Sequence, residues 1–575
     1  MELTKKTIGQ YLREQTAVIG DHTAMEMFGW SCSFAQLDET SDLMAGRLED
    51  MGVTRGTHVG IWSVNSPNWV FTFLALVKIG AVPVLINTCY RDEELKGILN
   101  YSDVEYVFCG AGCKDIVYDD VIADIRKDTP KVKRFLHLDE KEAGTWMSPD
   151  SFGRREKSPE VLVRVQELKS QVQPEDAACM IFTSGTTSLP KGILLSHEQL
   201  LNNSRAMVEE MHWGVTDKMC ITVPLFHCFG ITAGVIACIT GGMAMCLIPY
   251  FRTAHVWDAI DQYKCTILNG VPSMFLALIR KPQYAGRQAP DLRSGIIAGS
   301  PCTPEDFLEI CRRFPQMHLQ PSYGQTETSP CIAIADWDDP NEIKAVSAGH
   351  VIEHVKARIA DLATGKEAAP GKAGEIQVQG YNVMLGYYHL PQANAKVFTE
   401  DGWLRTGDIG YFDDKGELHI TGRLKEMIIR AGENISPREI ELAIRRYEGV
   451  ADVKVGGVPA QVLQEEIAAC VIPKPGVQID KERMLSYLKQ HLADYKVPAY
   501  VFWFEKFPMN ASGKIELKEL RKEAAERAAK QRETAGLSQY KLAEKMGVSQ
   551  ATVGMWESGK REPNFAMLCK LADFF

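Results

Sequence analysis

The sequence lacks the features that mark several classes of protein. Its first ten residues, MELTKKTIGQ, contain no apolar core of the kind found in a signal peptide. No low-complexity tract and no repeat of fixed period occurs along the chain. The apolar fraction of 45% and the charged fraction of 24% match a globular protein and exclude disorder, collagen and coiled coil as the main architecture. We therefore expect a folded cytoplasmic protein.

An excess of basic residues is also missing. The chain has 64 Lys and Arg against 74 Asp and Glu, a formal net charge of −10. This balance excludes a protein that coats nucleic acid through bulk positive charge. A short basic module within the chain is still compatible with it.

The 15 cysteines do not form a recognisable pattern. Their number is odd, and many lie in apolar runs, as Cys179 and Cys220 do. We interpret them as reduced, buried thiols and not as a disulfide framework. Cys109 and Cys113 are close in sequence, but no second pair and no histidine completes a zinc set, so both are interpreted as structural.

Charged residues are absent from Met219 to Phe251. A membrane helix is one interpretation of such a stretch. However, Pro224, Gly230 and Gly234 divide it into short pieces. We therefore predict a buried strand, a helix and a second strand here, and no membrane span.

Strands and helices alternate over most of the chain. At 575 residues, and with about 150 residues per domain, three or four domains are expected. A clear strand–helix–strand unit predicts adjacent parallel strands. Its parts are a strand at His58–Val64, a helix at Asn68–Ile79 capped by Ser66, and a strand at Val82–Ile86. A similar pattern returns at Gly295–Ala298 and Glu305–Phe314, which predicts a large α/β domain.

The pattern changes near Gly422. Ser436 and Glu439 have the spacing of a capping box at the start of a helix. Strands near Val453–Val458 and Ile467–Ile472 and a helix at Lys481–Leu492 complete a small α+β unit, and the chain after Glu516 has helical composition. We predict an α/β fold class with three domains: a large multi-sheet domain at 1–422, a small α+β domain at 423–520 and an all-α segment at 521–575.

A candidate phosphate-binding loop spans Thr183–Gly192 (TSGTTSLPKG). It follows an apolar strand, and its small and hydroxyl residues can wrap a polyphosphate with backbone N–H groups. It is not the Gly-x-x-x-x-Gly-Lys-Ser/Thr loop, because Gly192 and Ile193 follow Lys191. An exposed polar turn is the alternative, and the loop alone does not decide between them.

Seven further motifs occur with this loop. They are, in chain order, Pro224–His227 (PLFH), Ala298–Pro301 (AGSP), Tyr323–Glu327 (YGQTE), Gly374–Ile376 (GEI), Gly402–Asp408 (GWLRTGD), Gly422–Glu426 (GRLKE) and Ser512–Ile515 (SGKI). Over residues 5–520, the ordered set resembles the adenylate-forming superfamily of acyl-CoA synthetases, luciferases and stand-alone adenylation domains.

The resemblance implies a two-step reaction. ATP first adenylates a carboxylic acid and releases pyrophosphate, and the thiol of coenzyme A then attacks the acyl carbon. The residues implied to hold the β- and γ-phosphates are Thr183, Ser184, Gly185, Thr186, Thr187 and Lys191. Thr326 is implied to bind the α-phosphate, and Glu327 to hold Mg²⁺.

The remaining site residues follow from the same resemblance. Those implied to contact the nucleoside are Tyr323, Gly299 and Ser300 at adenine, and Asp408 and Arg423 at the ribose. Lys514 is implied to bridge the carboxylate and the α-phosphate, and Lys425 to be the hinge between two poses of the small domain. Gly432 is implied to face coenzyme A.

The acyl pocket is implied to include His227, Val271 and Gly299. His227 fits equally well as a hydrogen-bonded core histidine. The apolar side chains in this region suit an aliphatic or aryl acid. We expect a medium-chain fatty acid first, and a carnitine-like or aryl acid second.

The C-terminal segment, LSQYKLAEKMGVSQATVGMWESGKREP from Leu537 on, resembles a helix-turn-helix domain of the Cro/repressor type. The recognition helix would be Ser549–Ser558, with Gln539, Gln550 and Thr552 at DNA. However, this helix carries no Lys or Arg, and residues 516–575 hold eleven basic and nine acidic residues, a net +2. A folded appendage that binds DNA weakly, or a truncated or joined reading frame, is the alternative.

Three functions follow from these observations. The first is an ATP-dependent acid–CoA ligase, with ATP, Mg²⁺ and coenzyme A as its small-molecule requirements. The second is an acyl-responsive DNA-binding regulator that uses the helix-turn-helix. The third is an adenylation enzyme that loads a separate carrier protein. A homodimer is compatible with all three.

Overall fold

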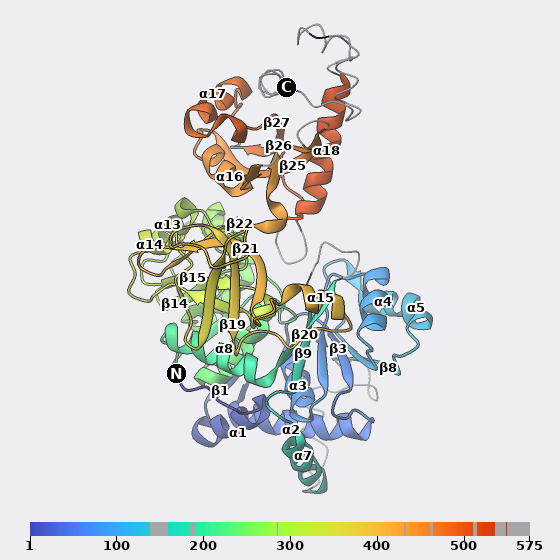
Figure 1. The fold of residues 1–575 in the computed structure, drawn as a ribbon. Helices are drawn as coiled ribbons and strands as arrows, with labels where there is room; N and C mark the ends of the chain where they lie inside the picture. The colour runs from blue at the N-terminus through green and yellow to red at the C-terminus, as the bar shows by residue number, and fades with distance from the viewer. Residues whose placement is uncertain are drawn as a thin grey trace. The chain divides into compact units, whose positions relative to one another are not determined.

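The structure, a computed structural model, describes residues 1–138, 159–183, 190–284, 286–430, 433–460, 464–509, 515–534 and 548. The chain divides into two compact units (Figure 1). Unit 1 comprises Met1–Lys372, Ile376–Thr406 and Phe412–His419, and unit 2 comprises Ala373–Glu375, Gly407–Tyr411 and Ile420–Phe575.

A nine-stranded sheet forms one half of unit 1. Its six central strands, β15 to β1 in the order below, are parallel, and an antiparallel strand or pair closes each edge. In spatial order the strands are β17 (His350–Val351), β16 (Cys331–Ile334), β15 (His318–Gly324), β14 (Ser294–Ile297), β13 (Ile267–Leu268), β11 (Lys218–Ile221), β12 (Ala244–Leu247), β1 (Thr23–Met27) and β2 (Trp30–Ser33).

A seven-stranded sheet forms the other half. In spatial order its strands are β20 (Gly386–Tyr387), β10 (Lys191–Ser196), β9 (Ala177–Thr183), β4 (Val82–Leu85), β3 (His58–Trp62), β5 (Tyr106–Cys109) and β8 (Arg134–His137). The predicted strand–helix–strand unit is confirmed: β3 and β4 are parallel neighbours, and α3 (Pro67–Lys78) between them is capped by the Ser66 side chain. This sheet is mostly parallel, but β9, β10 and β20 are antiparallel to one another in turn. Two short strands outside it, β6 (Gly112–Cys113) and β7 (Ile116–Val117), form a separate hairpin.

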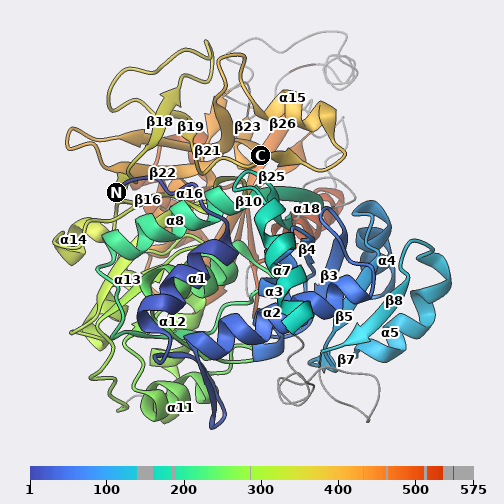
Figure 2. The ribbon, with the colours of Figure 1, turned by 90° about the horizontal axis from the view of Figure 1, so that it is seen from below.

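Helices cover both sheets of unit 1 (Figures 1 and 2). They are α1 (Ile8–Ile19), α2 (Phe34–Asp50), α3, α4 (Asp92–Tyr101), α5 (Tyr118–Ile125), α7 (Pro159–Gln171), α8 (His197–Glu210), α9 (Cys228–Gly230), α10 (Ala237–Gly241), α11 (Thr253–Tyr263), α12 (Pro272–Arg280), α13 (Pro304–Arg313), α14 (Asn341–Lys344) and α15 (Pro391–Val397). The uncharged stretch forms β11, a buried run of α9, the π-helix Ile231–Ile236 and α10, and then β12, as predicted. Among the described helices, none is both long and apolar enough to cross a membrane.

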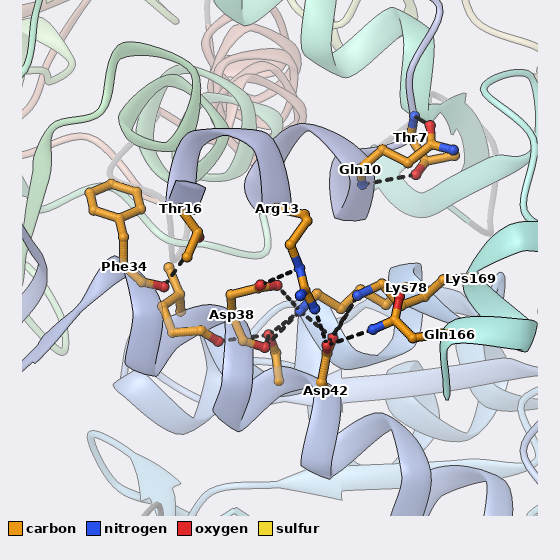
Figure 3. A network of polar contacts seen from close by, with 12 residues as sticks. Thr7, Gln10, Arg13, Thr16, Phe34, Asp38, Asp42, Lys78, Gln166 and Lys169 are labelled. Carbon is orange, nitrogen blue, oxygen red and sulfur yellow. Dashed lines mark hydrogen bonds and ion pairs between the residues drawn. The ribbon is translucent and has the colours of Figure 1, made fainter. Parts of the chain in front are cut away.

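A buried network of charges joins α1, α2, α3 and α7 (Figure 3). The Lys78 side chain is fully buried, and its Nζ lies 2.6 Å from carboxylate oxygens of both Asp38 and Asp42. Arg13 contacts both carboxylates, each at 2.7 Å, and Lys169 contacts Asp42 at 3.0 Å. Although burial alone would raise the pKa of Asp42, the charges of Lys78 and Lys169 hold it below its ordinary value. Each buried charge is therefore matched by a charge of opposite sign.

A four-stranded sheet contains the strands that precede the small domain. Its order is β18 (Val355–Ala360), β19 (Gly374–Gly380), β21 (Leu404–Phe412) and β22 (Leu418–Arg423). The turn between β21 and β22 belongs to unit 1, where the backbone N–H of Leu418 donates to the carbonyl of Gly349.

Unit 2 is an α+β unit, as predicted. Its sheet has the order β24 (Glu433–Ile435), β23 (Ile428–Arg430), β26 (Gln464–Pro473) and β25 (Val450–Ala460), with β27 (Tyr500–Trp503) beside β26. Its helices are α16 (Pro437–Arg445), α17 (Lys481–His491) and α18 (Leu517–Thr534). Aliphatic side chains of α16, α17 and the sheet form one core, and α18 packs on the other face of the sheet with Phe502 and Phe504.

Two details of the sequence analysis concern capping and cysteine. The capping box at Ser436 is wrong, although α16 begins where predicted. The Ser436 hydroxyl makes no cap hydrogen bond and instead donates to the carbonyl of Thr421, 2.9 Å away. All fourteen cysteines among the described residues are free, and Cys109 and Cys113 are buried in the unit 1 core, which agrees with reduced structural thiols.

Candidate active site

Strands β9 and β10 carry the two ends of the candidate phosphate loop. Thr183, the last residue of β9, pairs with Lys191, the first residue of β10. The antiparallel pairing holds these two residues, one at each end of the loop, side by side in the sheet. Ser184, Gly185, Thr186 and Thr187 lie outside the described residues.

The Lys191 side chain lies over an aromatic ring. Its Nζ is 4.3 Å from the centroid of the Tyr387 ring, a cation–π arrangement. Tyr387 belongs to β20, which pairs with β10 through Ile193 and Leu194, and the Tyr388 N–H donates to the carbonyl of Gly192 at 2.8 Å. The sheet thus fixes the ring beneath the lysine.

Tyr387 also reaches the residue implied to hold the metal. Its hydroxyl donates to Glu327 Oε1 at 2.9 Å. Burial and the adjacent Glu327 charge both raise the pKa of the Tyr387 hydroxyl, so it remains a donor at neutral pH. The N–H of Met384 donates to the carbonyl of Glu327 at 2.9 Å, which ties the same two segments by their backbones. Tyr387 therefore links Lys191 to Glu327, which lie 136 positions apart in the sequence.

Thr326 and Glu327 lie in a short 3-10 helix, Thr326–Thr328. The Thr328 hydroxyl accepts from the N–H of Gln325 at 3.2 Å and holds the start of this helix. Buried Thr326 has its hydroxyl 3.3 Å from the thiol of Cys228. A hydroxyl and a carboxylate side by side are hard oxygen donors of the kind that Mg²⁺ prefers, so the residues present fit this ion.

His227 is placed next to this helix by its neighbour Cys228. The Cys228 thiol lies 3.6 Å from His227 Nδ1, and the same nitrogen accepts from the N–H of Phe229 at 3.2 Å. His227 thereby caps α9. A capping role favours the structural interpretation of this histidine, although its position beside Thr326 also suits a pocket wall.

The residues implied to contact adenine lie at the ends of parallel strands. Tyr323 is near the end of β15, and Gly299 and Ser300 follow the end of β14 after Ala298. Gly299 has a φ of +83°, which an L side chain rarely adopts, and Ser300 is exposed. A Cβ at Gly324 would lie 1.7 Å from the carbonyl oxygen of Pro330, so only glycine fits after Tyr323.

Val271 is separate from these residues in sequence but close to them in topology. It is 6% exposed and precedes the first residue of α12. The preceding residue, Gly270, bridges to Ile297, the last residue of β14. This places Val271 near the strand end that carries Gly299.

The residues implied to bind ribose belong to unit 2. Asp408 is 5% exposed, and its Oδ1 lies 2.9 Å from Nε of Arg423, whose side chain is 63% exposed. Lys425 is exposed in the 3-10 helix Leu424–Glu426. Those that lie outside the described residues are Gly432, Lys514, Gln539, Gln550 and Thr552.

Sequence reasoning missed Tyr387 and Cys228. Tyr387 lies between the Gly374–Ile376 and Gly402–Asp408 motifs, and its relevance depends on the pairing of β20 with β10. Cys228 directly follows the Pro224–His227 motif, which was the available signal.

Family models match three parts of the chain. A model described as AMP-binding enzyme matches residues 12–388, one described as AMP-binding enzyme C-terminal domain matches 439–514, and one described as helix-turn-helix matches 529–575. The described site residues Thr183, Lys191, Thr326 and Glu327 fall within the first of these matches.

Full-length relatives and solved structures give the same result. The Bacillus subtilis (strain 168) protein YngI is 34% identical over 543 residues, which cover 91% of this chain and 98% of YngI. The human mitochondrial medium-chain acyl-CoA ligase ACSF2 is 31% identical over 550 residues, covering 91% and 88%. The crystal structure of ATP-bound MatB from Rhodopseudomonas palustris matches with a TM-score of 0.78 at 26% identity, over 91% of this chain and 99% of that one.

Proposed function

Because the chain belongs to the AMP-binding enzyme family, we propose that it activates a medium-chain fatty acid as the acyl-adenylate and transfers the acyl group to coenzyme A. The enzyme is an AMP-forming acid–thiol ligase that depends on ATP. The chain length of the acid rests on similarity to ACSF2, which is named a medium-chain acyl-CoA ligase. The observation that carries the proposal is the arrangement of Lys191, Tyr387 and Glu327 at the mouth of the β9–β10 hairpin.

In the first step, the hairpin tip and Lys191 would hold the β- and γ-phosphates. The neutral ring of Tyr387 would hold the Lys191 ammonium in place without cancelling its charge. Thr326 would donate to the α-phosphate. Glu327 would hold Mg²⁺, which offsets charge on the phosphates, and Tyr387 would fix the rotamer of Glu327 through its hydrogen bond.

The remaining groups of the first step would come from Asp408, near the end of the large domain, and from Arg423 and Lys514 of the small domain. Asp408 would accept hydrogen bonds from the ribose hydroxyls, with Arg423 holding the carboxylate. Lys514 would donate to the substrate carboxylate and the α-phosphate oxygen as charge develops at phosphorus. The acid oxygen attacks the α-phosphorus, and pyrophosphate leaves.

In the second step, rotation of the backbone at Lys425 would remove Lys514 and present Gly432 to the thiol. The thiol of coenzyme A would attack the acyl carbon, and AMP would leave with the bonding electron pair. We also propose that the large domain ends near 422 and the small domain near 520.

The mechanism is tested by measuring the two half-reactions separately. Lys514→Ala should abolish adenylation of the acid and largely spare thioester formation from preformed acyl-adenylate. Lys425→Pro should affect thioester formation more, because proline fixes φ at the hinge. Equal loss of both half-reactions in Lys514→Ala would contradict the role of this lysine.

Substrate identity is tested by trapping the acyl-adenylate with hydroxylamine across a panel of acids. Medium-chain fatty acids should give the highest kcat/KM, followed by aryl or carnitine-like acids. Transfer to coenzyme A should exceed transfer to the phosphopantetheine arm of a separate carrier protein. The reverse preference would replace the ligase by a carrier-loading enzyme.

The match of residues 529–575 to a helix-turn-helix supports a second activity, DNA binding. A stop codon at Arg532 should leave ligation intact and remove DNA binding measured by fluorescence anisotropy on genomic fragments. Binding of the full chain should fall steeply with salt, because phosphate contacts release counterions. Identical anisotropy curves for the two proteins would exclude DNA binding by this segment. The cytoplasmic location and the homodimer stay predictions.

A further inference from the structure

The turn between β21 and β22 gathers three metal-ligating side chains. They are Asp413, Glu417 and His419, and each places one ligand atom within 4.8 Å of those of the other two. Among the described residues, this is the group of His, Cys, Asp or Glu side chains that meets this limit. All three belong to unit 1. We infer that they form a binding site for one divalent cation of the zinc class, separate from the proposed Mg²⁺ site at Glu327.

The orientation of His419 is that of a metal ligand. Its Nδ1 lies 3.0 Å from the carbonyl oxygen of Val346, to which a protonated Nδ1 donates. Its Nε2 lies 3.0 Å from Asp413 Oδ2, a contact that is an ion pair when the ring is protonated and that a bound cation would replace. A histidine that binds a metal through one nitrogen usually donates the other N–H to a carbonyl or a carboxylate. The Val346 carbonyl provides that second contact here.

Glu417 supplies the independent observation. It is 3% exposed, and the hydrogen bonds that it makes with other described residues come from its backbone N–H and carbonyl groups. A buried carboxylate is destabilising unless a hydrogen bond or a cation compensates its charge. Its carboxylate faces that of Asp413, so the site concentrates negative charge that a divalent cation would offset.

A fourth carboxylate lies within electrostatic range. Asp339 feels the charge of Glu417, and its buried Oδ2 has no hydrogen-bond partner in the described structure. We do not assign it as a ligand, but it adds to the excess of negative charge. Lys344, on the neighbouring helix α14, donates to the carbonyl of Trp337, and its charge partly offsets that of Asp339.

The turn itself holds the site in shape. Asp413 Oδ1 accepts from the N–H groups of Lys415 and Glu417, at 2.9 and 3.0 Å, and leaves Oδ2 for the cluster. Gly416 has a φ of +81°, which lets the chain reverse within this turn. The ligands are thus spaced four and two residues apart on one rigid hairpin.

The chemistry of the donors selects the ion. One imidazole and two carboxylates suit Zn²⁺ and similar first-row cations, whereas Mg²⁺ and Ca²⁺ prefer oxygen alone. Zinc bonds to nitrogen and oxygen are about 2.0–2.2 Å, so two ligands of one ion lie at most about 4 Å apart. Closing the cluster onto zinc therefore needs side-chain shifts of about 1 Å or less.

The test measures Zn²⁺ binding by the full chain, in competition with a chromogenic chelator. Wild-type protein should bind one equivalent that Glu417→Gln and His419→Gln lose, with Kd weakened on the order of a hundredfold or more. Asp414→Asn is the matched control, because Asp414 is an exposed acid in the same turn outside the cluster. This control should bind as the wild type does. Equal Zn²⁺ binding by all four proteins would overturn the assignment.

A second measurement does not depend on the variants folding. Co²⁺ added to wild-type protein should give ligand-field bands without a thiolate-to-cobalt charge-transfer band, because no cysteine belongs to the cluster. Zn²⁺ should also slow hydrogen exchange of the backbone N–H groups of residues 413–419. A strong charge-transfer band, or exchange that Zn²⁺ leaves unchanged at this turn, would place the bound ion elsewhere and refute the proposal.

Discussion

Two lysines of unit 1 are held in opposite ways. Lys78 is fully buried and contacts two carboxylates, which are themselves contacted by Arg13 and Lys169. Lys191 lies over the neutral ring of Tyr387, at the end of the candidate phosphate loop. The first arrangement satisfies the cation completely, and the second holds the cation in place while its charge can still act on a ligand.

The difference separates structural charge from functional charge. A buried ion pair is costly to break and offers little to a substrate, because its charges are already neutralised. A cation over an aromatic ring is held by about 0.5–2 kcal/mol, which a phosphate can readily exceed. The pair of Asp408 and Arg423 is intermediate: the carboxylate is buried, but the arginine is largely exposed.

The largest effect should come from breaking the structural arrangement. Lys78→Met should lower the free energy of unfolding by about 3 kcal/mol or more, since two buried carboxylates lose their shared partner. Urea unfolding followed by tryptophan fluorescence measures this. Arg13→Met is the control, because the Arg13 side chain is 51% exposed and should contribute about 1 kcal/mol or less. Equal losses in the two variants would remove the distinction between buried and exposed members of the network.

The second effect concerns catalysis and not stability. Lys191→Ala should slow adenylation on the order of 10²–10³-fold, the usual result of deleting one preorganised charge. Its unfolding midpoint should stay close to that of the wild type, because the contact with the Tyr387 ring is worth only about 0.5–2 kcal/mol. Pyrophosphate exchange and thermal unfolding measure the two quantities. A variant that unfolds as early as Lys78→Met would show that Lys191 is structural too.

Much of the fold could be predicted from local signals. Ser66 and Pro67 fixed the start of α3, and the glycines and proline within the uncharged stretch correctly excluded a long helix. The capping box at Ser436 failed because its hydroxyl found the Thr421 carbonyl, a contact that depends on how β22 and α16 meet in space. A spacing of residues along the chain does not report such competition between acceptors.

The candidate site shows the same limit. Motifs identified Lys191 and Glu327 separately, because each lies in a distinctive local sequence. Tyr387, which joins them, lies in no such motif, and its importance comes from the antiparallel pairing of β20 with β10. Likewise, the cluster of Asp413, Glu417 and His419 depends on the turn between β21 and β22, which brings two turn residues close to one residue of β22.

The third effect separates the contribution of the Tyr387 hydroxyl from that of its ring. Tyr387→Phe keeps the ring beneath Lys191 and removes the hydrogen bond to Glu327, and it should slow adenylation about tenfold, as expected for a bond to a charged group. It should also raise the Mg²⁺ concentration needed for half-maximal pyrophosphate exchange. Tyr387→Leu, which removes ring and hydroxyl together, should be slower still. If both variants lose the same activity, the ring contributes nothing and Lys191 is held by the strand alone.

The smallest effect is expected for the exposed member of the intermediate pair. Arg423→Gln should change the free energy of unfolding by about 1 kcal/mol or less, because an exposed guanidinium is screened by water and salt. It should raise the KM for ATP severalfold, since the Asp408 carboxylate would lose the group that orients it toward the ribose. Asp408→Asn removes the buried charge itself and should raise this KM more. The decisive comparison uses 2′-deoxy-ATP, for which the two variants should approach the wild type if both act through the ribose hydroxyls. A KM gap that persists with 2′-deoxy-ATP would assign Asp408 and Arg423 to the structure of the hairpin, and would place this pair with Lys78 and not with Lys191.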